Sequence, residues 1–351
     1  MLSKVSDFIA KHRLLSPDGL HIVALSGGAD SVAMLHVLHS LGYRIEAAHC
    51  NFHLRGEESD RDENFVKALC KRLEIPIHLI HFDTREYAAL HQVSIEMAAR
   101  ELRYGYFRQL SQDIGASTVC VAHHRDDAVE TLLMNLLRGS GIHGLTGIRP
   151  QNGLIVRPLL GVTREEIEQY LHSIDENYVT DSTNLEDDVV RNKIRLRVLP
   201  LLKEINPRAA ENIHKTALYL SEAEQVYQAA IEARQSALIH HPSGGSTLTV
   251  AIPQLLQQPS PEAFLHEWLS PYGFNASQTE QVLSCLSGES GREFLSATHT
   301  LIIDREALIL SPLQPPMKTM KMPEEGCYRY DETKRFDVER SGEVTISKAP
   351  D

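Results

Sequence analysis

The sequence predicts an α/β protein that begins with a parallel, doubly wound sheet and continues with a helical region and a small α+β region. Two observations lead to this fold class. Between residues 20 and 160, short apolar runs of strand length alternate with segments of helical spacing, as in a parallel sheet covered by helices on both faces. After residue 163 the periodicity is helical, and strand-like runs return only beyond the linker-like stretch 240–246.

The first elements lie around a glycine turn near the N-terminus. A helix is expected over residues 3–15 and ends at the turn-forming stretch 16–19. The apolar run 22–25 predicts a buried strand, which a Ser-Gly-Gly sequence terminates. Apolar side chains at positions 32, 34, 35 and 38 then have helical spacing. Residues 22–38 are therefore expected to form a strand, a tight turn and a helix.

The rest of the chain divides in the same way. Further strands of the sheet are expected at 43–48, 76–82, 117–122 and 154–160, and helices at 57–73 and 95–112. A helix near 208–238 precedes a region with strands in 248–252 and 300–310 and helices near 261–269 and 277–287. We expect an α/β domain at 1–205, a helical linker at 206–242, a small α+β domain at 243–312 and, at 313–351, a tail or the start of a further domain.

Composition and charge restrict the class of protein. Hydrophobic residues make up 42% and charged residues 23%, as in ordinary globular proteins, and no apolar run approaches the roughly 20 residues of a membrane span. The N-terminus has the character of an amphipathic helix rather than of a signal peptide. Five scattered cysteines without a C-x-x-C pair argue against a zinc site and favour a reducing, cytoplasmic location. The net charge of −12 argues mildly against nucleic-acid binding, although local patches decide such binding.

The stretch that follows the strand 22–25 has the features of an anion-binding turn. Its two glycines permit a sharp turn and the close approach of a ligand, while its hydroxyls and the free N–H groups of a helix start favour phosphate. Asp30 would repel phosphate unless a cation lies between them, and Mg²⁺ is the usual bridge. The stretch matches neither a Walker A motif nor a dinucleotide fingerprint, and a simple capped strand-to-helix turn is the structural alternative. The candidate phosphate-binding residues are Ser26, Gly27, Gly28, Ala29, Asp30 and Ser31.

A second polar cluster, His123-His124-x-Asp126-Asp127-x-x-Glu130, follows the expected strand 117–122. Asp127 and Glu130 are three residues apart, so both project from one face of the helix that begins here. The spacing differs from the i, i+4 histidine pairs of helical zinc sites, so we discount a zinc site. Two interpretations stay open: acids that stabilise a helix N-terminus, or a site for a cation such as an amino group or a second Mg²⁺.

These motifs resemble those of a known family. The Ser-Gly-Gly-x-Asp-Ser turn resembles the pyrophosphate loop of the N-type ATP pyrophosphatases, whose sheet is of the adenine nucleotide alpha hydrolase type. Ordered motifs across residues 20–205 narrow the resemblance to the tRNA(Ile)-lysidine synthases, and the region 247–312 is similar to a small C-terminal domain of that family. The further motifs are His49-x-Asn51-x-x-Leu54-Arg55, Glu96 through Arg100 to Arg103-Tyr104, the cluster at His123, Arg138-Gly139-Ser140-Gly141, Arg157-Pro158-Leu159, Asp181-Ser182-x-Asn184 and Arg191-Asn192-x-Ile194-Arg195.

The resemblance implies an activity. Such an enzyme joins the ε-amino group of free L-lysine to C2 of the wobble cytidine in the CAU-anticodon isoleucine tRNA, through an adenylated tRNA intermediate, while ATP is cleaved to AMP and pyrophosphate. The product, lysidine, changes codon reading from AUG to AUA. Residues 1–205 would be the catalytic domain, with ATP and Mg²⁺ as cofactors. The tRNA and lysine would be the partners, in the cytoplasm and away from membranes, with a homodimer as the expected assembly.

The resemblance also implies roles for residues around ATP. Asp30 would hold Mg²⁺ on the ATP phosphates, while the N–H groups of the loop bind pyrophosphate. Arg100 and Arg103, which share one helix face, would neutralise charge on the transferring phosphate. These three side chains are therefore expected to act on the adenylation step.

For the second substrate and the tRNA, the implied residues lie later in the chain. Asp127 and Glu130 would position lysine, whose amine loses a proton to His124, Asp127 or water, and the sequence leaves these three alternatives open. Arg191 and Arg195 are candidate tRNA contacts, and an intradomain salt bridge is an equal alternative for both.

Other functions fit the sequence less well. A 2-thiocytidine synthetase would rely on paired cysteines, which are absent here. An NAD or GMP synthetase would use ammonia, and the histidine and acid cluster does not suit that chemistry. A nucleotide-binding module without catalysis tends to lose the acid of the loop, whereas Asp30 is present.

Overall fold

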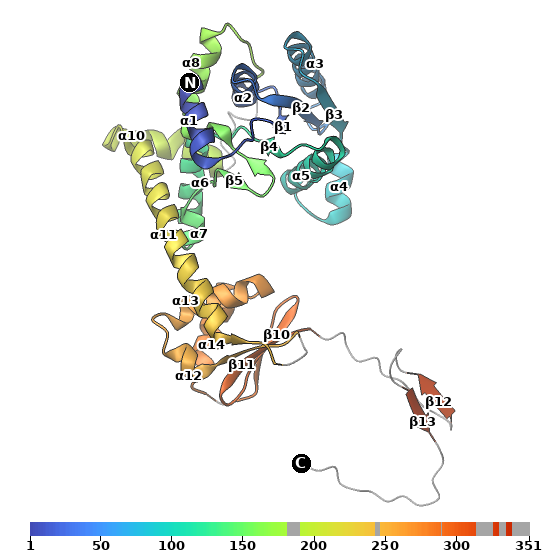
Figure 1. Ribbon diagram of the computed structural model, residues 1–351, viewed down its shortest axis with the longest axis vertical. Coiled ribbons are helices and arrows are strands. Elements are labelled where there is room, and N and C mark those ends of the chain that lie inside the picture. The colour runs from blue at the N-terminus through green and yellow to red at the C-terminus, as the bar shows by residue number, and fades with distance from the viewer. Residues whose placement is uncertain (181–189, 243–245, 289, 314–325, 330–334, 339–351) are drawn as a thin grey trace, which may run out of the picture. The chain divides into compact units, whose positions relative to one another are not determined.

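The computed structural model describes residues 1–180, 190–242, 246–288, 290–313, 326–329 and 335–338 (Figure 1). The chain divides into two compact units, Met1–Tyr227 and Gln228–Asp351. The first contains a mainly parallel sheet and the second an antiparallel one. The domain limits predicted from the sequence, at 205, 242 and 312, divide the chain into four segments rather than these two units. None of the described helices is both long and apolar enough to span a membrane.

A six-stranded sheet with the order β3-β2-β1-β4-β6-β5 forms the centre of the first unit. Neighbouring strands are parallel, except that β5 is antiparallel to β6. The predicted α/β class with a parallel sheet is therefore confirmed. The strands are β1 Leu20–Ala24, β2 Arg44–Asn51, β3 Ile77–His81, β4 Thr118–Cys120, β5 Gln151–Asn152 and β6 Ile155–Val156.

The last strand of this sheet differs from the prediction. A strand was expected over 154–160, but β6 ends at Val156 and residues Pro158–Gly161 form a 3₁₀ turn. Proline has no N–H to donate to a strand ladder, and its fixed φ suits the first turn of a helix. The antiparallel β5 was not predicted, because its two exposed residues carry no periodicity.

Helices cover both faces of the sheet. Adjacent residues of β1 point to opposite faces: Val23 packs with α1, α2 and α8, and Ile22 packs with α5. The helix α4 was not expected from the sequence. The helices are α1 Leu2–His12, α2 Ala29–Ser40, α3 Glu57–Arg72, α4 Thr84–His91, α5 Ile95–Ile114, α6 Arg125–Leu137, α7 Ile142–Leu145, α8 Arg164–Ser173, α9 Val190–Lys193, α10 Leu199–Ile205 and α11 Ala209–Leu238.

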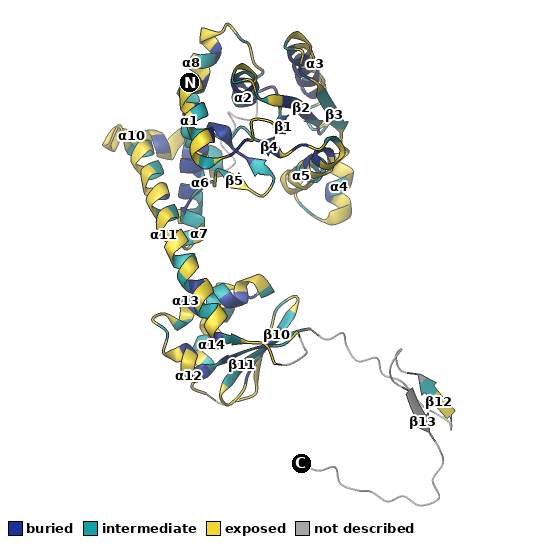
Figure 2. Cartoon of the chain, in the orientation of Figure 1, coloured by how far each residue is buried: buried dark blue, intermediate teal, exposed yellow. Residues whose placement is uncertain are grey.

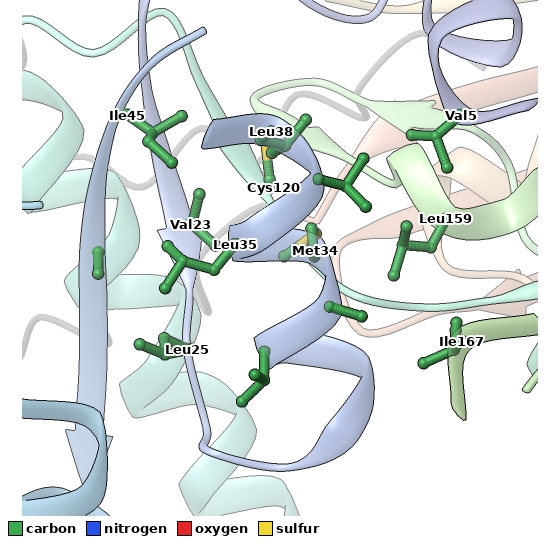
Figure 3. Close-up of a cluster of buried hydrophobic side chains, with 14 of the residues drawn as sticks. Val5, Val23, Leu25, Met34, Leu35, Leu38, Ile45, Cys120, Leu159 and Ile167 are labelled. Atoms are coloured by element: carbon green, nitrogen blue, oxygen red, sulfur yellow. The ribbon is translucent and has the colours of Figure 1, made fainter. Parts of the chain in front are cut away.

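The helix α2 is the most deeply packed of these. Figure 3 shows its Met34, Leu35 and Leu38 near Val23 of β1 and Leu25, which follows that strand, all of them almost inaccessible to solvent. By contrast, α11 carries mostly exposed or half-buried residues (Figure 2). Because α2 is held on several sides, the turn that enters it from β1 has a fixed position.

The segment 190–205, which contains Arg191 and Arg195, is helical with one irregular turn. Residues Ile194–Val198 form a π-helical turn between α9 and α10, a rare geometry that often marks functional sites. Ile194 and Leu199 pack on Val129 of α6. This packing draws the arginines of the segment toward the start of α6.

The second unit contains a five-stranded sheet with the order β7-β8-β11-β10-β9 and antiparallel pairs throughout. Its core is centred on Phe264 and Trp268 of α13. The stretch 300–310, expected to hold strands, forms the hairpin of β10 and β11. The elements are β7 Ile239–His240, β8 Leu248–Ala251, β9 Arg292–Leu295, β10 His299–Ile303, β11 Ala307–Pro312, α12 Ile252–Leu256, α13 Pro261–Leu269 and α14 Ala276–Cys285, with a separate pair β12 Gly326–Arg329 and β13 Arg335–Val338.

Candidate active site

The glycine turn lies where the sequence placed it, between the carboxyl end of β1 and the start of α2. Gly27 has a φ of +94°, a conformation that glycine adopts without strain. Gly28 is the N-cap of α2, and its extended backbone directs the first helical N–H groups away from the sheet. The geometry is therefore that of an anion-binding turn.

The hydroxyl of Ser31 lies at the centre of this turn. It accepts hydrogen bonds from the N–H groups of Ser26 and Gly27, each at 3.2 Å, and donates to the carbonyl of Gly28 at 2.9 Å. The N–H groups of Ser26 and Gly27, which precede the helix start, are thus bonded to Ser31. A bound phosphate would therefore have to share or replace these bonds.

Asp30 presents one free oxygen to the site. Its Oδ2 accepts a hydrogen bond from Arg164 Nη1 at 2.8 Å, whereas the buried Oδ1 has no hydrogen-bond partner among the described residues. His124 Nε2 is 3.7 Å from that oxygen. Burial raises the pKa of Asp30, and His124 and Arg164 partly counteract this shift. An orphaned carboxylate oxygen beside a phosphate-binding turn fits Mg²⁺, which prefers oxygen ligands.

The two histidines after β4 differ in their electrostatic environment. Burial lowers the pKa of His123 to about 4. Burial also opposes the charged form of His124, but Asp126, Asp127 and Asp30 outweigh it and raise the pKa of His124. Near neutral pH His123 is therefore a neutral imidazole, while His124 tends to carry a positive charge.

Asp126 has a structural role that the motif alone did not reveal. Its Oδ2 accepts a hydrogen bond from the backbone N–H of Arg164 at 2.8 Å, at the start of α8. Despite burial, the hydrogen bonds from His124 and from that N–H lower the pKa of Asp126 to about 2. This contact places the Arg164 side chain beside Asp30.

The raised pKa of His124 leads to a stability prediction. A histidine whose folded pKa lies above its usual 6.5 stabilises the fold fully below that value, and this contribution is lost as pH rises through the folded pKa. Between pH 6 and pH 8, the Tm of the wild type should therefore fall more steeply than that of His124→Gln. Differential scanning fluorimetry across this range measures the difference, with His91→Gln as an exposed control; parallel curves for wild type and His124→Gln would contradict it.

The carboxylate of Glu130 is paired with an arginine. Arg195 donates from Nε and Nη2 to the two carboxylate oxygens of Glu130, at 2.6 and 3.0 Å, and its Nη2 is 3.5 Å from Asp127. Arg191 donates to Thr131 and lies 3.8 Å from Glu130. Glu130 is only 1% exposed, and burial raises its pKa against the influence of Arg195. The structure thus contains the intradomain salt bridges that the sequence weighed equally with tRNA contacts.

The arginine pair of α5 is divided between two positions. The guanidinium of Arg103 lies 5.2 Å from the ring centre of Phe52 and lines the main cavity. The guanidinium of Arg100 lies 5.0 Å from the ring centre of Tyr104 and is not part of that lining. Arg103 is therefore better placed to reach a ligand in the cavity.

A cavity of about 1140 Å³ connects these groups. It lies at the carboxyl ends of β1, β2 and β4, the edge at which open parallel sheets bind ligands. Arg164, which the sequence analysis did not single out, also lines it, and no local motif could have found a partner 134 residues from Asp30. The motif at 181–184 lies outside the described residues. The predicted residues in the lining are Ser26, Gly28, Asp30, Ser31, Arg103, His124, Asp127, Glu130 and Arg195.

A segment before that gap supports the turn from outside. The N–H of Val179 donates to the carbonyl of Gly27 at 2.9 Å. Three residues earlier, Glu176 is 8% exposed and pairs with Arg72 and, at 2.8 Å, with His36 of α2. Glu176 therefore ties the segment that holds Gly27 to the helix that follows it.

We expect Glu176→Gln to raise KM for ATP roughly tenfold, because a buried charge-assisted hydrogen bond is weakened. The kcat should change much less, since no reacting group is altered. Steady-state kinetics with varied ATP measures both constants. Glu46→Gln is the matched control, because Glu46 pairs with His78 at 2.7 Å on the neighbouring strands. An unchanged KM would show that Glu176 does not position the turn.

Comparison with known proteins adds to this geometry. Residues 3–202 match the family model described as a PP-loop domain, and residues 243–313 match the TilS substrate binding domain. Among solved structures, the U34-tRNA thiolase NcsA from Methanococcus maripaludis aligns with a TM-score of 0.52 at 18% identity, covering 63% of this chain and 77% of that one. At this identity the similarity concerns the fold alone.

Curated relatives match over most of the chain. The tRNA(Ile)-lysidine synthase of Bacteroides thetaiotaomicron is 47% identical over 97% of this chain and 81% of the relative. That of Parabacteroides distasonis is 49% identical over 93% of this chain and 74% of the relative. That of Bacillus subtilis is 35% identical over 80% of this chain and 63% of the relative. The chain therefore belongs to the tRNA(Ile)-lysidine synthase family.

Proposed function

We propose that this chain forms lysidine on isoleucine tRNA in two steps within the main cavity. It first transfers AMP from ATP to the C2 oxygen of the wobble cytidine, and the ε-amino group of lysine then displaces AMP. Family membership supports ATP-dependent modification of tRNA(Ile). The observation that carries the residue roles is that one cavity holds a phosphate-binding turn, a free Asp30 oxygen and a paired acidic site.

For the first step, the turn and its neighbours bind the phosphates. The N–H groups from Ser26 to Asp30 would donate hydrogen bonds to pyrophosphate oxygens, and the N–H groups of Ser26 and Gly27 would then leave the Ser31 hydroxyl. Asp30 Oδ1 would ligate Mg²⁺, which when bound neutralises negative charge on the phosphates. Arg164 occupies Asp30 Oδ2, so Oδ1 is the carboxylate oxygen left without a hydrogen bond for the metal. Arg103 can approach the transferring phosphate from α5.

His123 has a defined tautomer in this arrangement. The Nε of Arg157 donates to His123 Nδ1 at 3.3 Å, so the neutral ring carries its proton on Nε2. We propose that this N–H donates to the cytidine or to the phosphate and does not serve as the base. Among the alternatives that the sequence left open for the proton of lysine, we favour Asp127 or water, because the neighbouring carboxylates raise the pKa of His124.

For the second step, Asp127 and Glu130 would position lysine. Both carboxylates now surround the guanidinium of Arg195, so the acidic site already holds a cation of the same charge as a lysine ammonium. The substrate would share or replace Arg195, which would then be free to contact tRNA phosphate. Roles for Arg191 and Arg100 in binding tRNA and phosphate stay predictions.

The test is a pair of measurements on one reaction. With ATP, Mg²⁺ and CAU-anticodon isoleucine tRNA, pyrophosphate release and transfer of labelled lysine to the tRNA are followed with and without lysine. Lysine transfer that needs ATP and this tRNA supports the proposal. Pyrophosphate release without lysine transfer would mean an adenylating enzyme with another nucleophile, and no release would overturn the proposal.

Two further features of the proposed function are its location and its assembly. We propose a cytoplasmic location, where ATP, lysine and tRNA are all present. A homodimer stays a prediction, which light scattering of the purified chain tests.

A further inference from the structure

A second, smaller hollow lies beside the main cavity. We call it the side pocket; its volume is about 380 Å³, and it follows β2 and β3 at their carboxyl ends. In the strand order β3-β2-β1-β4, it lies along the same sheet edge as the phosphate-binding turn, about 10 Å away at the usual strand spacing. Phe52 lines both hollows, so they are adjacent. The side pocket is lined by Phe52, His53, His81, Phe82, Asp83, Thr84 and Arg85.

Two stacked pairs of rings form its surface. The rings of Phe52 and Phe82 are 5.6 Å apart and inclined by 24°. The rings of His53 and His81 are 5.0 Å apart and inclined by 19°, and a hydrogen bond of 2.9 Å joins them. Both histidines are exposed and both phenylalanines are half-buried, so ring surface is available to a ligand.

A buried polar network fixes the histidines in place. Asn51 accepts a hydrogen bond from the backbone N–H of His53 and donates to Glu63, whose Oε2 is 3.5 Å from His81 Nε2. Asn51 and Glu63 are 2% and 6% exposed. His53 has a φ of 51°, a conformation that costs free energy for any residue except glycine. The proposed chemistry does not use this network. The network nevertheless keeps the strained His53 stacked on His81.

The two loops that bear the rings are also joined to each other. Phe82 donates from its N–H to the carbonyl of Asn51, and the buried Thr84 donates from its hydroxyl to the carbonyl of Phe52. The only acid of the lining, Asp83, accepts the N–H of Glu86 and so caps α4. Arg85 adds a positive charge at the rim.

We propose that the side pocket binds the base of a nucleotide adjacent to the target cytidine. Proteins recognise single-stranded RNA by stacking its unpaired bases on aromatic and histidine rings, with basic side chains on the phosphates. The side pocket offers such rings beside the cavity that would receive the cytidine; Arg85 is part of its lining, and Arg103 contacts the ring of Phe52 and lines the main cavity. This assignment rests on the proposed function, since it requires a tRNA anticodon loop in the main cavity.

The test combines pocket variants with altered tRNA. Two versions of the isoleucine tRNA carry an abasic nucleotide, one immediately before and one immediately after the target cytidine. His81→Ala should weaken binding of intact tRNA about 5- to 20-fold, the lower part of the range for one stacked base. For the abasic tRNA that lacks the base bound in the side pocket, the Kd should be the same for His81→Ala and for the wild type. Binding is measured as Kd at one fixed salt concentration, because phosphate contacts depend on salt.

Further variants separate stacking from folding. His53→Gly removes the ring and also its backbone strain, so it should weaken tRNA binding without lowering Tm. His91→Ala, which removes an exposed histidine in tilted ring contact with Tyr87 outside the pocket, is the matched control and should leave Kd unchanged. The KM for ATP should stay constant in all three.

The outcomes are distinct for the two proposals. Equal weakening of intact tRNA and both abasic tRNAs by His81→Ala, or no weakening of any, would overturn the base-binding assignment. Absence of lysine transfer by the wild-type chain would instead overturn the proposed function. Since Kd is measured without lysine or ATP, the two results are independent of each other.

Discussion

Replacing Asp30 with asparagine is expected to lower kcat for tRNA-dependent pyrophosphate release by about 10²- to 10³-fold, the usual effect of removing one preorganised electrostatic group. The substitution keeps the shape of the side chain but removes the charge of its unpaired oxygen. The concentration of Mg²⁺ needed for half-maximal rate should rise, because that oxygen is the proposed protein ligand. Pyrophosphate release over a Mg²⁺ titration measures both effects.

The same substitution should make the protein more stable. Burial raises the pKa of Asp30 in the fold, so the folded state disfavours its charged form, and this loss of stability develops as pH rises above the ordinary aspartate pKa of 3.8. At pH 7, Asp30→Asn should therefore raise Tm while activity falls, a trade-off common at functional sites. Glu168→Gln is the matched control, because Glu168 also pairs with Arg164, at 2.7 Å. A variant with normal activity would remove Asp30 from the mechanism.

Replacing Glu130 with glutamine is expected to have the second large effect. It leaves the half-buried guanidinium of Arg195 without its main partner, and this loss is partly offset because burial raises the pKa of Glu130 and so already disfavours its charge; the net cost should be about 1 kcal/mol of unfolding free energy. Lysine transfer should fall about 10²-fold or more, while lysine-independent pyrophosphate release is largely retained. Chemical denaturation and labelled-lysine transfer measure the two consequences.

A double variant distinguishes the structural effect from the effect on lysine. Glu130→Gln combined with Arg195→Met removes both charges, so much of the lost stability should return. Lysine transfer should stay low, because Asp127 alone would remain to hold the ammonium. If transfer recovered together with stability, Glu130 would be a purely structural residue.

Local sequence was sufficient for the elements around the turn. A buried strand, two glycines and an apolar helix face form a short-range pattern, and the structure reproduces it at β1 and α2. The histidine and acid cluster was likewise placed correctly at the start of a helix, α6. The 3₁₀ turn at Pro158 was missed because the proline ends a weak apolar run. The strand β5 was missed because its two exposed residues carry no periodicity.

The sequence by itself determined which residue types gather at the carboxyl edge of the sheet, because the alternation of strands and helices follows from local periodicity and the carboxyl ends of parallel strands meet at one edge. It could not decide how the charged groups pair there. Arg164 reaches Asp30 and Arg195 reaches Glu130 across 134 and 65 residues of chain, and both pairs exist only because α8 and the 190–205 segment pack beside the cavity. The sequence alone does not specify which charged side chain pairs with which. Burial makes an unpaired charge costly, so the tertiary structure selected Arg195 for Glu130 and left Asp30 with one free oxygen.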